Sequence, residues 1–169
     1  MPGYECRECG FSFALDDAEA VGPLIVESVH EISSILRDGD AIALRRRADP
    51  DTWSVHEYSC HLRDVFLVQR ERVLLVRRSA TPPEVVAMGR DERVEHDGYE
   101  SQLTLDVARQ LEDAASLFAH VLSLLEADTW ERTMIYSYPE RAERTLRWVA
   151  VHTLHEVRHH RRDIDAQLG

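Results

Sequence analysis

Lysine is missing from this sequence of 169 residues, and its 20 basic residues are all arginine. These arginines are interleaved with 31 acidic residues, which gives a formal net charge of −11 at pH 7. Proteins bind nucleic acids and anionic membranes through patches of basic residues. The acidic balance therefore argues against both partners, and we expect a small-molecule substrate.

Long hydrophobic runs are also missing. No stretch approaches the roughly 20 apolar residues of a membrane span, and the opening segment, MPGYECRECGF, lacks the apolar core of a signal peptide. The sequence has only three cysteines, an odd number that does not describe a disulfide framework. We therefore expect a cytoplasmic protein.

Four long amphipathic patterns are present. Apolar residues recur at helical spacing in residues 23–38, from Trp53 to just before Pro82, and in residues 105–126 and 145–168. With 44% apolar residues, the chain suits one compact core. These patterns predict an all-α fold, a four-helix bundle that spans residues 21–169.

The segments outside these helices predict three further features. Residues 81–102 contain two consecutive prolines and two glycines among many charges, which indicates a long connection between the second and third helices with at most a short helix in it. The β-prone run at 133–136 predicts a brief strand or an extended crossing. Residues 1–20 form a short N-terminal CxxC extension that we expect to pack on the bundle.

The last predicted helix carries five potential metal ligands: His152, His155, Glu156, His159 and His160. At about 100° per residue, its apolar side chains form one stripe, with His160 near the middle and Glu156 at the edge. Residues four apart lie one turn apart on one face, the spacing at which two helical ligands share an ion. We expect His155 and His159 to face outward, although they remain the alternative pair. The competing interpretation is a solvated helix end whose cations interact with the helix dipole.

A third ligand is expected from another helix, because metal sites in four-helix bundles are built from side chains that face the bundle axis. His61 is the candidate, since it lies with Tyr58 and Leu62 on the apolar stripe of the second helix. A single histidine on an apolar face is more often a core residue than a ligand. The inward pair of Glu156 and His160 reverses that preference.

Cys6 and Cys9 form a CxxCG motif that looks like half of a zinc ribbon. A whole ribbon needs a second pair of ligands, and the only other cysteine is Cys60, which we expect to be a small core residue. Three interpretations stay open at this point: a residual knuckle without metal, a redox pair, or an incomplete site completed by histidines or by a second subunit.

Two motifs resemble the DinB/YfiT-like metalloenzymes, a superfamily of four-helix bundles that hold a metal with three side chains. The segment WSVHEYSCHLRD, with Trp53 eight residues before His61, is similar to the second-helix motif of the family, which ends in a ligand histidine. The segment EVRHHRRDI is similar to its terminal pattern, and alignment on the closing Asp-Ile pair again selects Glu156 and His160. Mycothiol-dependent maleylpyruvate isomerases, relatives in this superfamily, also use a glutamate in place of the commoner first histidine.

The resemblance implies a metal held by His61, Glu156 and His160, with one position open for water or substrate as in catalytic zinc sites. Zinc is the expected metal, and nickel or iron also suits this ligand set. Asp64 and Asp163 each follow a ligand histidine by one turn. They are candidate acceptors for imidazole N–H groups, or else solvent-facing helix acids.

Some members of this superfamily are transferases or isomerases in which the metal activates a low-molecular-weight thiol such as mycothiol or bacillithiol. The resemblance therefore implies a metal-dependent thiol transferase or isomerase. The alternatives are a hydrolase that uses metal-bound water and a non-enzymatic helical module that mediates dimerisation. A homodimer is expected because bundles of this kind often pair through helix faces. No catalytic residue is assigned.

Overall fold

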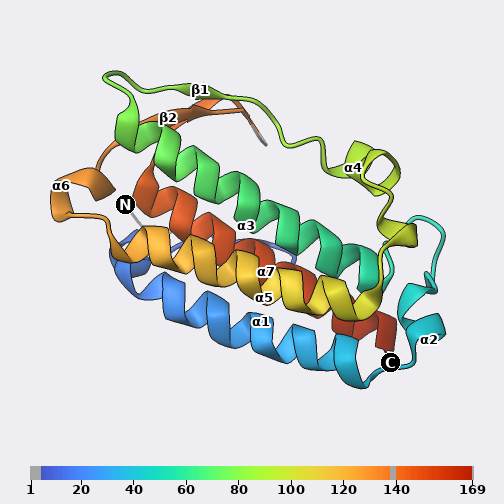
Figure 1. Cartoon of the computed structure of the whole chain (residues 1–169). Coiled ribbons are helices and arrows are strands. Elements are labelled where there is room, and N and C mark those ends of the chain that lie inside the picture. The colour runs from blue at the N-terminus through green and yellow to red at the C-terminus, as the bar shows by residue number, and fades with distance from the viewer. Residues whose placement is uncertain (1–4, 138–139, 169) are drawn as a thin grey trace.

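The computed structural model describes residues 5–137 and 140–168. Within them, four long helices form the bundle that the periodicity predicted: α1 (Val21–Asp38), α3 (Val55–Arg78), α5 (Thr104–Ser123) and α7 (Leu146–Leu168) (Figure 1). Each begins and ends within a few residues of its predicted bounds, because the apolar stripes that define the helices also form the core.

The long helices pack in an order that differs from their order along the chain. Helix α5 packs against α1 and α3, and α7 packs against the same two helices, so α1 and α3 lie on a diagonal. Figure 1 shows α3 and α5 running in the same direction, because the connection over residues 79–103 returns along the length of the bundle. This topology places α7 beside α3, the helix of His61.

The connections hold more structure than the sequence indicated. The 79–103 connection contains β1 (Glu84–Val85), α4 (Arg90–His96) and the 3₁₀ turn η2 (Tyr99–Ser101). Strand β1 pairs in parallel with β2 (Thr133–Tyr136), and β2 pairs antiparallel with β3 (Ala142–Thr145). The β-prone run at 133–136 is therefore a strand, at the centre of a small sheet that precedes α7.

Three shorter elements complete the described chain. Helix α2 (Ala41–Arg45) follows α1, and α6 (Ala127–Trp130) follows α5. The 3₁₀ helix η1 (Leu15–Ala20) leads into α1 and contacts α7. Among the described residues, none of the helices combines the length and the apolar character needed to cross a membrane.

The start of α3 is fixed by a capping box between Ser54 and Glu57. The Ser54 hydroxyl accepts from the backbone N–H of Glu57, and the Glu57 carboxylate accepts from the backbone N–H of Ser54 at 2.8 Å. Arg47 also donates to both oxygens of Glu57, at 2.6 and 2.9 Å. Because His61 lies one turn further along α3, these contacts help to set its position.

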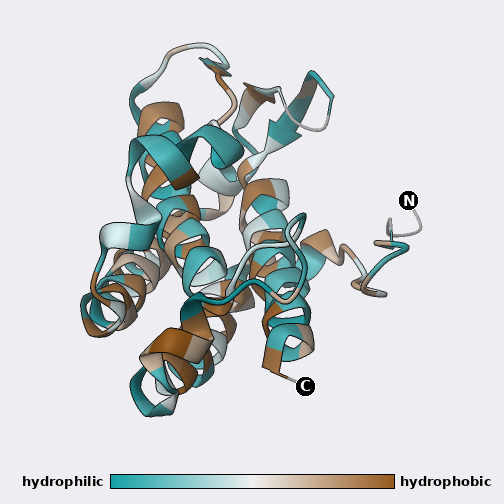
Figure 2. Ribbon diagram, turned by 90° about the vertical axis from the view of Figure 1, so that its right-hand side faces the viewer, coloured by the Kyte–Doolittle hydropathy of each residue, from teal (hydrophilic) through white to brown (hydrophobic). Residues whose placement is uncertain are grey.

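The apolar faces of the four long helices form one core, in which Phe66 of α3 stacks on Phe118 of α5. Cys60 is completely buried, as expected of a small core residue. Phe11 and Phe13 are also buried, so the N-terminal segment packs on the bundle. Figure 2 shows this segment beside the helix that ends at the C-terminus.

We expect Glu57→Ala to lower the free energy of unfolding by about 1–3 kcal/mol at pH 7, because it removes both the cap and a partly buried ion pair. Burial acts to raise the pKa of Glu57, but Arg47 and Ser54 outweigh it and hold the pKa below its ordinary value of 4.5. A lowered carboxyl pKa stabilises the fold above the unfolded-state pKa, and this stability is lost as the pH falls through the folded-state pKa. Urea denaturation should therefore show the difference shrinking below pH 4.5.

The matched control is Glu84→Ala. Glu84 forms an ion pair with Arg141 at 2.9 Å, but both side chains are more than half exposed. Exposed ion pairs contribute little to stability. An equal loss of stability in both variants would contradict the role given to the cap of α3.

Candidate metal centre

The three predicted ligands meet where α3 packs on α7. One ligand atom from each of His61, Glu156 and His160 lies within 4.8 Å of the other two. The Glu156 Oε2 atom is 3.9 Å from His61 Nε2 and 3.7 Å from His160 Nε2. These distances are too long for hydrogen bonds. They are close to the roughly 3.3–3.6 Å that separates two ligands of one zinc ion when each bond is about 2.0–2.2 Å long.

His61 is almost completely buried, yet neither of its ring nitrogens has a hydrogen-bond partner within the described chain. Buried polar atoms without partners are rare in native proteins. Burial lowers the pKa of His61 by more than the nearby Glu156 raises it, so the imidazole is neutral at pH 7. A neutral, unpartnered imidazole is the form that binds a metal, so His61 fits the ligand role.

The Glu156 carboxylate lies among four histidines. Its Oε1 atom faces the other side of the cluster, 3.8 Å from His152 Nε2 and 3.5 Å from His155 Nδ1. Burial acts to raise the pKa of Glu156, but His155, His160 and His61 outweigh it and hold the pKa well below its ordinary value. The carboxylate is therefore anionic. Its side chain is 22% exposed, against 2% for His61 and 8% for His160, so Glu156 is the most exposed of the three.

Asp163 contacts the His160 ring and fixes its orientation. The Nδ1–H group of His160 donates to Asp163 Oδ2 at 2.9 Å, which leaves Nε2 directed toward Glu156. Burial acts to lower the pKa of His160, but Asp163 and Glu156 outweigh it and raise the pKa above its ordinary value. A carboxylate on the far nitrogen of a ligand histidine is a common arrangement around metals.

Asp64 has a different role from the one that the sequence suggested. Its Oδ1 atom accepts from Arg63 at 2.9 Å, and its Oδ2 atom accepts from Tyr99 at 2.8 Å and from Arg93 at 3.2 Å. Neither ring nitrogen of His61 has a hydrogen-bond partner among the described residues, so Asp64 is not an acceptor for this ring. It instead holds the 79–103 connection against α3.

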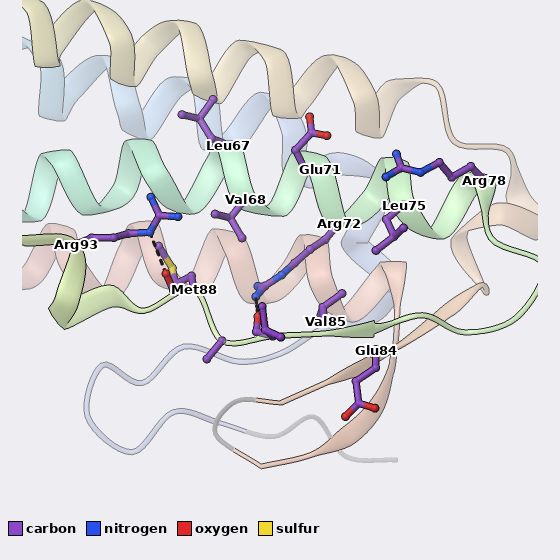
Figure 3. A pocket seen from close by; sticks show the side chains of 12 residues that line it. Leu67, Val68, Glu71, Arg72, Leu75, Arg78, Glu84, Val85, Met88 and Arg93 are labelled. Atoms are coloured by element: carbon purple, nitrogen blue, oxygen red, sulfur yellow. Dashed lines mark hydrogen bonds between the residues drawn. The ribbon is translucent and has the colours of Figure 1, made fainter. Parts of the chain in front are cut away.

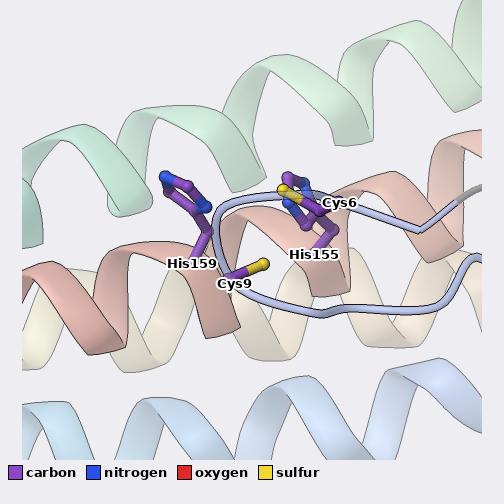
Figure 4. A group of neighbouring side chains, drawn as sticks. All are labelled: Cys6, Cys9, His155 and His159. Atoms are coloured by element: carbon purple, nitrogen blue, oxygen red, sulfur yellow. The ribbon is translucent and has the colours of Figure 1, made fainter.

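The expectation that His155 and His159 face outward is wrong. They lie on the face of α7 opposite the bundle core, as the helical periodicity indicated, but the N-terminal segment covers that face. Their side chains are only 13% and 20% exposed. Figure 4 shows the loop of Cys6 and Cys9 lying along α7, with the two cysteines next to the two histidines. One ligand atom from each of these four residues lies within 4.8 Å of the others.

A groove of about 540 Å³ lies between α3 and residues 84–88 (Figure 3). None of the predicted metal ligands lines it. Arg72 and Arg93 cross the groove and donate to the backbone carbonyls of Val86 and Met88. Arg72 also donates to the hydroxyl of Tyr136, whose ring packs 5.8 Å from that of His152. Arg72 in the wall of the groove is thus connected through Tyr136 to His152, which lies beside Glu156.

The sequence model of the DinB superfamily matches residues 25–164. This chain belongs to the DinB superfamily. The match includes all three predicted ligands and confirms the family that the motifs around His61 and His160 indicated. In this DinB-superfamily protein, Cys6 and Cys9 precede the matched region.

Comparison with solved structures confirms the fold. YfiT from Bacillus subtilis is similar to 99% of this chain over 94% of its own, with a TM-score of 0.74 and 15% sequence identity. It is described as a probable metal-dependent hydrolase with an unusual four-helix bundle topology. At this identity the likeness shows the bundle fold alone. A comparison with curated proteins gave no match.

For the second cluster of this DinB-superfamily protein, the sequence left open a site at Cys6 and Cys9 completed by histidines, but it did not indicate which histidines. Cys6 and Cys9 are spaced as C-x₂-C, and His155 and His159 as H-x₃-H, which are the spacings found in two-cysteine, two-histidine zinc sites. That combination was the available signal. The two pairs were not connected because almost the whole chain separates them.

We expect Asp163→Asn to weaken zinc binding by about 10- to 100-fold, since it removes the acceptor that orients the His160 ring. Asp64→Asn should leave zinc affinity unchanged and lower the free energy of unfolding by about 1–3 kcal/mol, because it breaks buried hydrogen bonds. Competition with a zinc-binding dye and urea denaturation measure the two effects. Equal weakening of zinc binding in both variants would show that Asp64 also supports the metal ligands, contrary to the role assigned to it here.

Proposed function

We propose that this DinB-superfamily protein is a metal-dependent enzyme in which His61, Glu156 and His160 hold a divalent ion, with zinc as the resident metal. We further propose that it transfers or isomerises small molecules with a low-molecular-weight thiol, of the mycothiol or bacillithiol type, as co-substrate. The observation that carries the proposal is the buried, unpartnered His61 imidazole opposite the Glu156 carboxylate.

The three side chains suit a catalytic ion better than a structural one. Structural zinc sites use four protein ligands, whereas catalytic sites use three and leave a position open. One carboxylate and two neutral imidazoles leave a divalent ion with a net positive charge, which favours an anion in the open position. When bound, the metal supplies the charge that stabilises a thiolate or a hydroxide near neutral pH.

The residues around the ligands hold the site in place and limit its contact with water. The ring of Trp53 packs 5.1 Å from that of His61, and the ring of Tyr58 packs 5.1 Å from that of His160. Burial lowers the pKa of His152 to about 4, so this imidazole remains uncharged beside Glu156. Access from the exposed side of Glu156 would bring both thiol and electrophile to the same open position.

Hydrolysis is the second candidate function, because the structural neighbour YfiT is described as a probable metal-dependent hydrolase. The same ligand set suits metal-bound hydroxide as well as a thiolate. The two functions differ in one requirement that can be measured, since thiol transfer and thiol-dependent isomerisation need an added thiol and hydrolysis does not.

The test uses untagged protein that is stripped with a chelator and reloaded with zinc. The parent is incubated with mycothiol or bacillithiol and a panel of electrophiles, and products are followed by mass spectrometry. We expect product formation that needs both the thiol and zinc. His61→Ala and His160→Ala should each bind one equivalent of zinc fewer than the parent and lose turnover. His120→Ala, which removes an exposed histidine of α5, is the matched control and should retain both.

Turnover without added thiol would contradict the transferase or isomerase proposal and support the hydrolase proposal. Equal zinc content in the parent and in His61→Ala would overturn the metal site itself. A zinc-loaded parent that forms no product with any thiol or in its absence would favour a non-enzymatic module.

A further inference from the structure

The CxxCG motif folds into a tight loop. The backbone N–H of Cys6 donates to the carbonyl of Phe11, and that of Gly10 donates to the carbonyl of Cys6, both at 2.8 Å. Gly10 has a φ of 71°, in the left-handed region that glycine adopts readily. The loop thus holds the Cys6 and Cys9 sulfurs within 4.8 Å of each other.

His155 and His159 meet this loop from α7. They are four positions apart in the sequence, so they lie one turn apart on one face of the helix. Both ring nitrogens of His155 and the Nδ1 atom of His159 are buried without a hydrogen-bond partner among the described residues. Buried nitrogens without a partner are unusual in a native structure, and those of His155 Nε2 and His159 Nδ1 indicate a partner of another kind.

We propose that Cys6, Cys9, His155 and His159 bind one structural zinc ion that fastens the N-terminal segment to α7. One ligand atom from each residue lies within 4.8 Å of the others. In a tetrahedral site with Zn–S bonds of about 2.3 Å and Zn–N bonds of about 2.0–2.1 Å, the ligand atoms stand about 3.3–3.8 Å apart. The four atoms therefore need to approach one another by no more than about 1.5 Å (Figure 4).

Carboxylates stand behind both histidines. His155 Nδ1 lies 3.5 Å from Glu156 Oε1, and His159 Nε2 lies 3.5 Å from Glu8 Oε2. In each ring, the opposite nitrogen is left for the metal. Both distances are longer than those of hydrogen bonds, so each ring needs a small shift toward its carboxylate to gain the arrangement that orients histidine ligands in many zinc sites.

The donor set specifies both the metal and its role. Two sulfurs and two imidazoles suit tetrahedral zinc, and four protein ligands leave no position for substrate. Cysteine binds zinc as a thiolate, so both thiols release their protons to solvent when zinc binds, and the two thiolates then balance the charge of the ion. None of these four residues is a ligand in the centre of His61, so the inference does not rest on the proposed function.

The test uses the reduced, untagged full-length protein, stripped with a chelator and reloaded with Co²⁺. Cysteine ligation gives a strong sulfur-to-cobalt absorption in the near ultraviolet, which a site of imidazoles and a carboxylate does not give. We expect this absorption in the parent and in His61→Ala, and its loss in the double variant Cys6→Ser/Cys9→Ser. Zinc analysis after desalting should show one equivalent fewer in the double variant and in His159→Ala. The control His120→Ala should match the parent.

A second measurement needs no substitution, and so does not depend on whether a variant folds. Alkylation of Cys6 and Cys9 is followed by mass spectrometry with and without zinc. At free zinc about 100-fold above its Kd, alkylation of both residues should slow by about 100-fold.

Three results would overturn the proposal. The first is a cobalt-loaded parent without the sulfur absorption. The second is an absorption that persists in the double variant, since Cys60 would then be its source. The third is equal alkylation of Cys6 and Cys9 with and without zinc. A Cys6–Cys9 disulfide that forms in air at the same rate with and without zinc would identify a redox pair instead.

Discussion

The Glu156 carboxylate lies between imidazoles on two sides of α7, with Oε2 toward His61 and His160 and Oε1 toward His152 and His155. A carboxylate in this position loses much of its hydration and needs positive charge or hydrogen-bond donors nearby. Two segments far apart in the sequence meet here. Helix α3 contributes His61, and the loop before η1 covers His155 with Phe11 and Phe13. The arrangement of α3, α7 and the N-terminal segment is therefore organised around one anion.

The helical periodicity of the sequence was sufficient to predict the bundle and the inward pair of Glu156 and His160, because core packing and periodicity are the same constraint. It could not predict that a second apolar surface covers the other face of α7. Phe11 and Phe13, with rings 5.4 and 5.1 Å from that of His155, come from a segment with no helical pattern of its own. A polar helix face is assigned to solvent unless such a distant contact is known.

The hydrogen-bond partners of Asp64 also could not be predicted from the sequence. Its position one turn after His61 indicates that it shares a helix face with a ligand, but not which of several donors it binds. Tyr99, Arg63 and Arg93 occupy its oxygens, and two of them belong to a connection whose path the sequence left undefined. Strands β1 and β3 were not predicted. They have only two and four residues, and pairing with β2 stabilises them more than their own composition does.

The pairing of α7 with both α3 and the N-terminal loop also bears on how the chain folds. Contacts between residues far apart in sequence form late, because the entropy cost of closing a long loop comes before the contacts can stabilise the chain. During synthesis α1, α3 and α5 emerge before α7, so the apolar faces that α7 covers remain open until then. Both histidine clusters are therefore completed at the end of folding, on a scaffold that is already largely packed. A metal ion that binds at either cluster would therefore meet its complete set of ligands only after α7 has packed.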